Sequence, residues 1–348
     1  MNPRLDVTSA LFLDLHHARL PHWASLTTGI PAALRESEHE RSVAATVADM
    51  HRVPAGITVR SSLHALVDVF RLLPRPGDTV AVDEGTYSVL QWAANTARDA
   101  GARVYRYPHL RPDGIDRLGT GRLWIATDGW CGGCNHPAPI PHLQNLVRAR
   151  GGGVVVDDTL AWGILGCPTA RGTNDGSGTP RWLGTDHDQI VWVASFAKAL
   201  GTPITVLTGK AETVARLAKS GSRLHGSPPS APEVAAAEMS LRSPRGLARR
   251  RRMLWANVHA LRRALALAAV PLVGRPFPIL NIPVVDPHVG YQWWTNFRTR
   301  GVDALVREPH CCPGAQITVV VRAGLSPTDI ATLVDTIAPM APRIGVQT

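Results

Sequence analysis

The chain has 348 residues, of which 45% are hydrophobic and 18% are charged, a balance typical of a globular rather than a disordered protein. Its length can bury a substantial core and predicts more than one domain. No apolar run reaches the ~18 residues of a membrane-spanning helix, and no basic segment followed by an apolar core opens the sequence. We therefore expect a cytoplasmic protein. Five cysteines, an odd number in a chain this long, do not indicate a disulfide framework.

The net charge of +10 would suit a protein that binds nucleic acid. However, the densest basic cluster, Arg249–Arg252, lies in a segment whose leucine and valine residues recur at helical spacing. The arginines are then the solvated face of an amphipathic helix, and no nucleic-acid-binding motif accompanies them. The charge favours anionic partners in general, such as a phosphorylated substrate, coenzyme A or an acidic carrier protein.

Periodicity along the chain predicts three regions. Residues 1–45 show little periodicity and are expected to form an arm. Over residues 46–235 strands alternate with helices, which predicts a large α/β domain with a mostly parallel sheet and helices on both faces. A long helix, short strands and a closing helix predict a smaller α+β domain over residues 236–348. The expected strands are Thr79–Val82, Val104–Tyr107, Leu123–Thr127, Val154–Val156, Ile190–Ala194, Ile204–Leu207, Ile279–Val285 and Ile317–Val321. The expected helices include Leu63–Leu73, Val89–Ala100, Ile140–Ala149 and Thr328–Ile337.

Two serines and a tyrosine precede helices in the first part of the large domain. Ser61 and Ser62 open an apolar helix, where free N–H groups and hydroxyls suit a phosphate group, although an ordinary helix cap is the simpler interpretation. Tyr87 follows a strand that ends at Asp83. Its ring could stack on a flat heterocycle or belong to the core.

A strand later in the large domain, Val154–Val156, ends on two carboxylates, Asp157 and Asp158. In open α/β sheets, ligands bind at the carboxyl ends of the strands. A carboxylate at that position suits a protonated ring nitrogen of a cofactor. One of the two aspartates could instead cap the following segment.

Lys198 follows the apolar stretch of residues 190–196, and only three of the 37 basic residues in the chain are lysines. Burying an ammonium group is unfavourable unless its pKa falls or the amine is used in a covalent bond. A lysine in an apolar setting is therefore suited to form a Schiff base with an aldehyde cofactor. The simpler alternative is a surface lysine at the end of a strand.

Taken in this order, the segments resemble fold-type-I enzymes that depend on pyridoxal 5′-phosphate (PLP), and most closely the α-oxoamine synthases, or 8-amino-7-oxononanoate synthase family. The resemblance runs from about residue 50 to 340. It implies that Asp157 in VVVDDTLAWGILG pairs with the pyridine nitrogen and that Lys198 in SFAKALG is the Schiff-base lysine. It further implies that Tyr87 in TYSVL stacks on the cofactor ring. The residues that the resemblance assigns to the phosphate are Ser61, Ser62, Ser195 and, from a second subunit of a homodimer, Ser227.

Three positions depart from the family pattern, and all three concern the substrate. Leu160 stands where the family has a histidine, and Gly132, in the loop CGGC, stands where it has a serine near the cofactor. Thr318 stands where it has the arginine that binds the substrate carboxylate. Arg322, four residues on, would share a strand face with Thr318 and could replace that arginine. The residues that select the substrate are thus expected to differ from those of the family.

Cysteines occur in two pairs, Cys131 with Cys134 and Cys311 with Cys312, the latter after His310. Zinc sites use such pairs. Because the first pair falls on a cofactor-facing loop of the resembled family and the second pair is adjacent rather than spaced, we predict no metal. Small residues that open the substrate pocket account for the CGGC loop equally well.

The function implied by the resemblance is carbon–carbon bond formation at the α-carbon of an amino-acid substrate, and we expect it to belong to secondary metabolism. Lys198 would remove the α-proton, and the partner substrate would be an acyl-CoA, an acyl carrier protein or another phosphorylated electrophile. A PLP-dependent aminotransferase is the alternative within the same chemistry. A non-catalytic basic binding protein on the same fold is a further alternative.

Overall fold

The structure is a computed structural model that describes residues 4–17, 26, 33–34, 37–170, 172–185, 189–284 and 286–343. The chain forms two compact units, each of which is described by itself. The large unit consists of Leu15–Trp130 and Pro137–Leu247, and the small unit of Met1–Asp14, Cys131–His136 and Ala248–Thr348. The predicted arm is thus divided between the two units, and the CGGC loop belongs to the small one.

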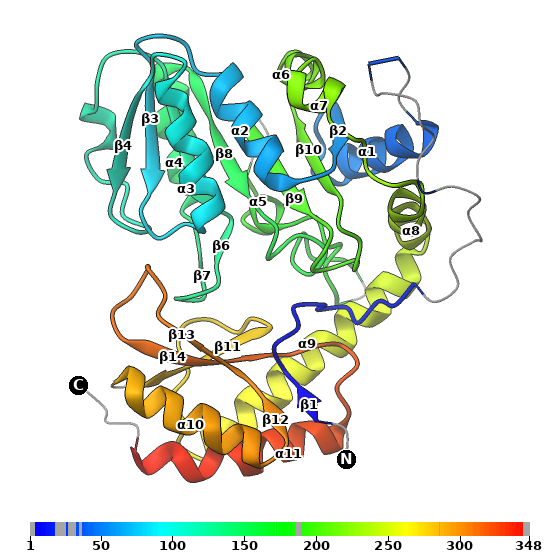
Figure 1. The fold of residues 1–348 in the computed structure, drawn as a ribbon, viewed down its shortest axis with the longest axis vertical. Coiled ribbons are helices and arrows are strands. Elements are labelled where there is room, and N and C mark those ends of the chain that lie inside the picture. Colours follow the sequence, from blue (N-terminus) through cyan, green and yellow to red (C-terminus); the bar gives the residue numbers. More distant parts are fainter. Residues whose placement is uncertain are drawn as a thin grey trace. The chain divides into compact units, whose positions relative to one another are not determined.

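The large unit contains a seven-stranded sheet in the order β2-β10-β9-β8-β5-β3-β4 (Figure 1). All strands run parallel except β10, which is antiparallel to both of its neighbours. Only residues 196–204 connect β9 to β10, and so short a connection cannot make a parallel crossover. The sheet confirms the predicted α/β class. The strands are β2 (Ala55–Val59), β3 (Thr79–Asp83), β4 (Arg103–Tyr107), β5 (Leu123–Asp128), β8 (Gly152–Asp157), β9 (Ile190–Ser195) and β10 (Thr205–Gly209).

Helices cover both faces of this sheet, because the central strands are apolar on both sides. In β8, Val155 packs on one face, while Val154 and Val156 pack on the other. The first face is covered by α2 (Ser62–Leu72), α3 (Ser88–Asn95), η1 (Thr96–Arg98) and α6 (Ala211–Ala218). The second is covered by α4 (Ile140–Arg150), η2 (Ile115–Arg117) and α1 (Glu38–His51), whose His51 stacks on Trp192 of β9. The remaining helices of the unit are α5 (Thr179–Trp182), α7 (Gly221–His225) and α8 (Ala231–Leu241).

The small unit is built on a three-stranded antiparallel sheet in the order β11-β14-β13. The N-terminal strand β1 (Leu5–Asp6) joins this unit by pairing with β12 (Val302–Asp303). Two-residue strands β6 (Trp130–Cys131) and β7 (His136–Pro137) pair with each other and enclose the CGGC loop. The other elements are α9 (Pro244–Leu267), β11 (Ile279–Val284), α10 (Pro287–Thr299), β13 (Leu305–Arg307), β14 (Ala315–Val320), α11 (Pro327–Ile337) and η3 (Ala338–Arg343).

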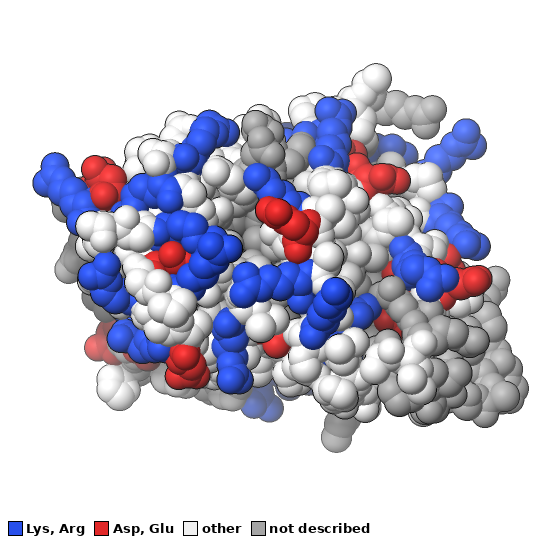
Figure 2. Space-filling view, turned by 90° about the horizontal axis from the view of Figure 1, so that it is seen from above, with Lys and Arg blue, Asp and Glu red and all other residues white. Residues whose placement is uncertain are grey.

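The long helix α9 is amphipathic as predicted, since Leu254, Val258, Leu261 and Leu265 are fully buried. Helix α10, which the sequence analysis did not identify, buries Trp293 and Phe297. Among the described residues, no helix is both long enough and apolar enough to cross a bilayer. Figure 2 shows Lys and Arg side chains spread widely over one face of the protein with fewer Asp and Glu side chains among them, consistent with the net charge of +10.

Candidate cofactor site at the carboxyl edge of the sheet

Several polar side chains lie at the carboxyl ends of neighbouring strands of the large unit. The strand register aligns Asp128 of β5 with Asp157 of β8, and Asp157 with Val193 of β9. Ser195 ends β9, and Tyr87 follows the end of β3. Because these strands are parallel, their carboxyl ends share one edge of the sheet, which is where open α/β sheets bind their ligands.

Asp157 and Lys198 interact electrostatically at this edge. Asp157 Oδ1 accepts a hydrogen bond from Thr159 N at 3.1 Å, and Thr159 Oγ1 accepts one from Ser195 N at 3.1 Å. Burial raises the pKa of the Asp157 carboxyl, whereas its hydrogen bonds with Thr159 and the Lys198 ammonium group act in the opposite direction. The lysine charge is therefore near enough to act on this carboxylate.

Asp158, by contrast, is hydrogen-bonded inside the core of the large unit. Its side chain is fully buried, and Oδ2 accepts hydrogen bonds from Thr179 N at 2.8 Å and from Trp192 Nε1 at 3.1 Å. Burial raises the pKa of this carboxyl to about 7. The aspartate that caps the segment directly after β8 is Asp157, through the Thr159 N–H, whereas Asp158 accepts from the backbone of Thr179 in the distant helix α5. Asp157 is left at the sheet edge beside Lys198.

The turn that carries Lys198 is anchored by apolar contacts on both sides of the lysine. Phe196 is fully buried and stacks on Trp162, with ring centroids 4.1 Å apart. Ala199 and Leu200 are buried as well, while the Lys198 residue itself is half-buried. The lysine thus lies on a turn whose neighbouring residues are anchored in the core. Leu160, at the histidine position of the resembled family, is also half-buried, in the turn that follows β8.

The N-terminus of α2 forms a second candidate binding region of the large unit, suited to an anion. Ser61 is the N-cap in an extended conformation and makes no side-chain capping bond, and Ser62 is the first helical residue. The unpaired N–H groups of a helix start and the nearby hydroxyls form an anion-binding arrangement. Next to it, a groove of about 680 Å³ is lined by Arg60, Arg223 and Ser227 among other residues. The exposed Ser227 thus lies near basic groups that suit a phosphate.

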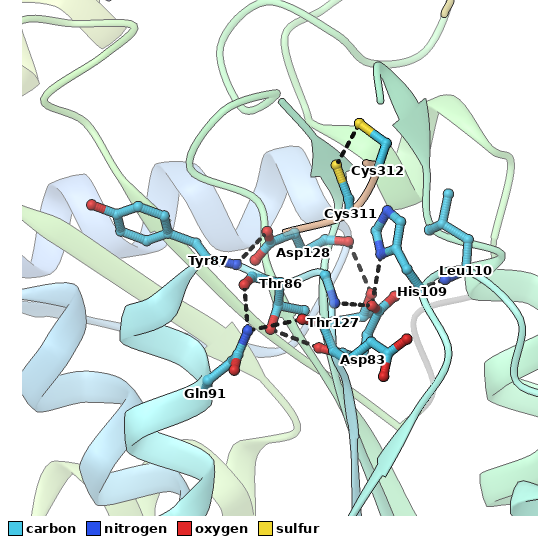
Figure 3. Close-up of polar contacts among 12 residues, drawn as sticks. Asp83, Thr86, Tyr87, Gln91, His109, Leu110, Thr127, Asp128, Cys311 and Cys312 are labelled. Carbon is cyan, nitrogen blue, oxygen red and sulfur yellow. Dashed lines mark hydrogen bonds and ion pairs between the residues drawn. The ribbon is translucent and has the colours of Figure 1, made fainter. Parts of the chain in front are cut away.

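Tyr87 is 67% exposed, so the core alternative for this residue is wrong. Its backbone N–H donates to Asp128 Oδ2 at 2.9 Å, which fixes the residue at the sheet edge (Figure 3). Sequence reasoning missed this role of Asp128, although a carboxylate that ends a strand was the signal.

A second fully buried carboxylate, Asp83, shapes the loop that leads to Tyr87. It contacts His109 Nδ1 at 2.7 Å and accepts from the backbone N–H groups of Gly85 and Leu110 (Figure 3). A Cβ atom at Gly85 would collide with the His109 ring, so a glycine is needed here. The Asp83–His109 pair was not foreseen from the sequence.

In the small unit, the prediction for Arg322 was wrong in its geometry. Strand β14 ends at Val320, so Arg322 lies beyond it and does not share a strand face with Thr318. Its guanidinium group instead contacts Asp14 Oδ1 at 3.6 Å and donates to the Asp6 carbonyl at 2.9 Å. Arg322 therefore fastens the N-terminal segment to the small unit.

Arg307, which sequence reasoning missed, contacts Thr318 directly. Its Nε donates to Thr318 Oγ1, and its Nη2 donates to the Gly132 carbonyl and to Asn281 Oδ1, all at 2.9 Å. Burial lowers the pKa of this guanidinium group. Gly132 thus offers its carbonyl to Arg307. The available signal was an arginine that ends the short β-like run LVR before the cysteine pair.

The large-unit residues fit a planar, phosphorylated pyridine cofactor. Asp157 suits a protonated ring nitrogen, the exposed Tyr87 suits a flat ring, and the start of α2 suits a phosphate. The half-buried Lys198 supplies an amine. The seven-stranded sheet and these residues are consistent with the fold-type-I class of PLP-dependent enzymes.

The sequence is similar to proteins of one group of PLP-dependent enzymes. The chain is 27% identical to 8-amino-7-oxononanoate synthase of Acidithiobacillus ferrooxidans over 294 residues, covering 82% of this chain and 72% of that protein. It is 25% identical to the Pseudomonas putida enzyme of the same name over 315 residues, covering 88% of this chain and 78% of that protein. No family model matches the sequence. The chain is thus similar to the α-oxoamine synthases, which are PLP-dependent transferases.

Solved structures share the fold at low sequence identity. Serine palmitoyltransferase from S. paucimobilis superimposes with a TM-score of 0.85 at 17% identity, covering 99% of this chain and 88% of that one. The 8-amino-7-oxononanoate synthase from Francisella tularensis gives a TM-score of 0.76 at 15% identity, covering 97% of this chain and 98% of that one. These similarities confirm the predicted fold.

Proposed function

We propose that this enzyme joins the α-carbon of an amino acid to the acyl group of an anionic acyl donor, such as an acyl-CoA or an acyl carrier protein. The single observation that carries the proposal is the electrostatic pair of Asp157 and Lys198 at the carboxyl ends of β8 and β9. In the overall reaction, a carbon–carbon bond forms between the α-carbon and the acyl carbon, while the thioester carbon–sulfur bond breaks.

PLP would be held by the large-unit residues described above. Asp157 would pair with the ring nitrogen, Tyr87 would lie on the ring, and Ser61, Ser62 and Ser195 would bind the phosphate. When bound, PLP supplies an electron sink for a carbanion at the α-carbon. Ser227 would reach the phosphate bound by a second copy of the chain in a homodimer, since it is exposed and lies in a basic groove.

Lys198 would act as the base that takes the α-proton of the amino acid. Its amine suits this role because it is half-buried on a fixed turn and close to the carboxylate of Asp157. The buried aromatic pair Trp162 and Phe196 holds the turn in place, which keeps the proton acceptor oriented.

For the substrate carboxylate, we propose Arg307 in preference to Arg322. Arg307 contacts Thr318, which stands at the position of the family's carboxylate-binding arginine, whereas Arg322 contacts Asp14 and the Asp6 carbonyl. We also propose Gly132 and Leu160 as substrate-selecting positions, because each is smaller or less polar than the family residue at its position. We further propose that the enzyme works in the cytoplasm, which suits its five cysteines, none of which forms a disulfide in the described structure.

The test is to incubate the PLP-loaded enzyme with a panel of amino acids and acyl-CoA thioesters, and to follow the released CoA thiol and the product mass. We expect CoA release only when both substrates are present, and none with Lys198→Ala. Lys210→Ala is the matched control, since Lys210 precedes α6 and is exposed. Release of a keto acid from an amino acid alone would instead show an aminotransferase.

A further inference from the structure

Three cysteine thiols converge within the small unit. The Sγ atoms of Cys131, Cys134 and Cys311 all lie within 4.8 Å of one another. Cys131 and Cys134 belong to the CGGC loop, whereas Cys311 lies in the turn between β13 and β14. Cys312 adjoins this cluster, with its Sγ 3.7 Å from that of Cys311 (Figure 3). None of the five cysteines, all of which the structure describes, forms a disulfide.

The CGGC loop is held in place by hydrogen bonds to three of its backbone carbonyls. Asn281 Nδ2 donates to the carbonyls of Gly132 and Gly133, each at 2.8 Å. Asn135 closes the loop by donating its N–H to the Cys131 carbonyl at 3.0 Å, and its backbone adopts φ 55°. The two cysteines of the loop are thus presented on one tight turn, as in CxxC metal sites.

The second segment is fixed against the first. Gln316 Nε2 of β14 donates to the Gly133 carbonyl at 3.3 Å and to Cys312 Sγ at 3.2 Å. A Cβ atom at Gly133 would collide with Cys311 Sγ, so the glycine permits the close approach of the third thiol. This accounts for a glycine inside the CGGC loop by the packing of the small unit.

We propose that Cys131, Cys134 and Cys311 bind a zinc ion as three thiolates. Zinc–sulfur bonds of about 2.3 Å in a tetrahedral site place two sulfur atoms roughly 3.8 Å apart, which the cluster reaches by small side-chain movements. Binding releases the three thiol protons to solvent and leaves the fourth tetrahedral position open to a further ligand. This proposal reverses the prediction of no metal, which relied on sequence spacing alone.

A disulfide explains the arrangement less well than zinc does. A disulfide would join only two of the three thiols and would leave the third beside it. Soft thiolate ligands select zinc among the divalent ions that prefer tetrahedral geometry. The bound ion would link the CGGC loop to the turn before β14, and so hold Gly132 next to Arg307.

The experiment measures zinc in the whole PLP-loaded enzyme. Protein purified with a reductant is stripped with a chelator, incubated with one equivalent of zinc, gel-filtered and assayed by atomic mass spectrometry. We expect the wild type to retain one zinc ion per chain, and Cys134→Ser and Cys311→Ser to lose most of it. Cys167→Ser is the control that keeps zinc, because Cys167 lies in the large unit, where its Sγ donates to the Arg181 carbonyl.

Cobalt substitution tests the ligands directly. The wild type loaded with cobalt should show a thiolate-to-metal charge-transfer band that weakens in Cys311→Ser. The bound PLP in each variant shows whether it has folded. Zinc-free wild-type protein with all thiols reactive would overturn the proposal, as would a reductant-sensitive loss of two thiols without zinc, which indicates a disulfide. Equal zinc retention by folded Cys134→Ser and Cys311→Ser would overturn it too.

Discussion

The two units place their functional side chains by different means. In the large unit, Asp157, Ser195 and Lys198 each follow directly after a strand or end one, so the order of a parallel sheet brings them to one edge. In the small unit, Cys131 and Cys311 come from segments distant in sequence, and hydrogen bonds from Asn281 and Gln316 bring those segments together. A site at strand ends can be located from periodicity, whereas a site made of docked loops requires the tertiary structure.

The largest expected effect concerns the amine of the sheet-edge site. Lys198→Ala should reduce turnover by at least about 1,000-fold, because it removes both the covalent amine and the proposed base. Steady-state kinetics of the variant with saturating PLP provides the measurement. Lys219→Ala, at the end of α6, should retain full activity. An equal loss of turnover in Lys198→Ala and Lys219→Ala would show that Lys198 has no special role at the sheet edge.

The buried Asp158 should make stability depend on pH. Its carboxyl has a pKa of about 7 in the folded chain against an ordinary value of 3.8. Between these values the folded state holds a proton that the unfolded state has released, so stability falls as the pH rises from about 4 to 7. The fall amounts to at most about 4 kcal/mol, at roughly 1.4 kcal/mol per pKa unit. Urea unfolding at several pH values should show this slope in the wild type and a flatter one in Asp158→Asn.

Asp157 should matter for chemistry where Asp158 matters for stability. Asp157→Asn should lower kcat roughly 100-fold, as expected when a charged partner of the reacting system is lost. Its unfolding free energy should change little, since the Asn side chain can still accept the hydrogen bond from Thr159 N. An Asp157→Asn enzyme with normal kcat would remove this carboxylate from the proposed site.

The two arginines of the small unit separate substrate binding from structure. Arg307→Ala should raise KM for the amino acid by roughly 10- to 100-fold, because a charge-assisted contact with a carboxylate is lost. Arg322→Ala should leave KM unchanged and lower the melting temperature, since its contacts are with Asp14 and Asp6. If KM rises only in Arg322→Ala, the original assignment is the correct one.

The smallest expected effect is at Tyr87. Tyr87→Ala should weaken PLP binding about fivefold, since aromatic stacking contributes roughly 0.5–1.5 kcal/mol. Tyr87→Phe should bind PLP as the wild type does, because the ring remains and the backbone N–H that Asp128 accepts is unaffected. Fluorescence titration with PLP distinguishes the two. Weaker binding in the Phe variant would assign the role to the hydroxyl instead.

Much of the large unit was predictable, because its strands are apolar on both faces and their ends are marked by carboxylates and turns. The positions of Lys198 and Asp157 at strand ends follow from that pattern, whereas their proposed roles come from the family resemblance. The antiparallel direction of β10 did not, since strand direction depends on the short connection from β9. The prediction that Arg322 shares a strand face with Thr318 was wrong, because β14 ends two residues before Arg322. Arg307 and the cysteine cluster escaped prediction because their partners lie on other strands and loops.

The most direct test of the central claim is peptide mapping of wild-type protein that has been incubated with PLP and reduced with borohydride. The chain contains only three lysines, at positions 198, 210 and 219, so the labelled site can be assigned without ambiguity. We predict a reduced pyridoxyl group on Lys198 alone. An unlabelled Lys198, or a label shared among the three lysines, would contradict a PLP site at the carboxyl edge of the sheet.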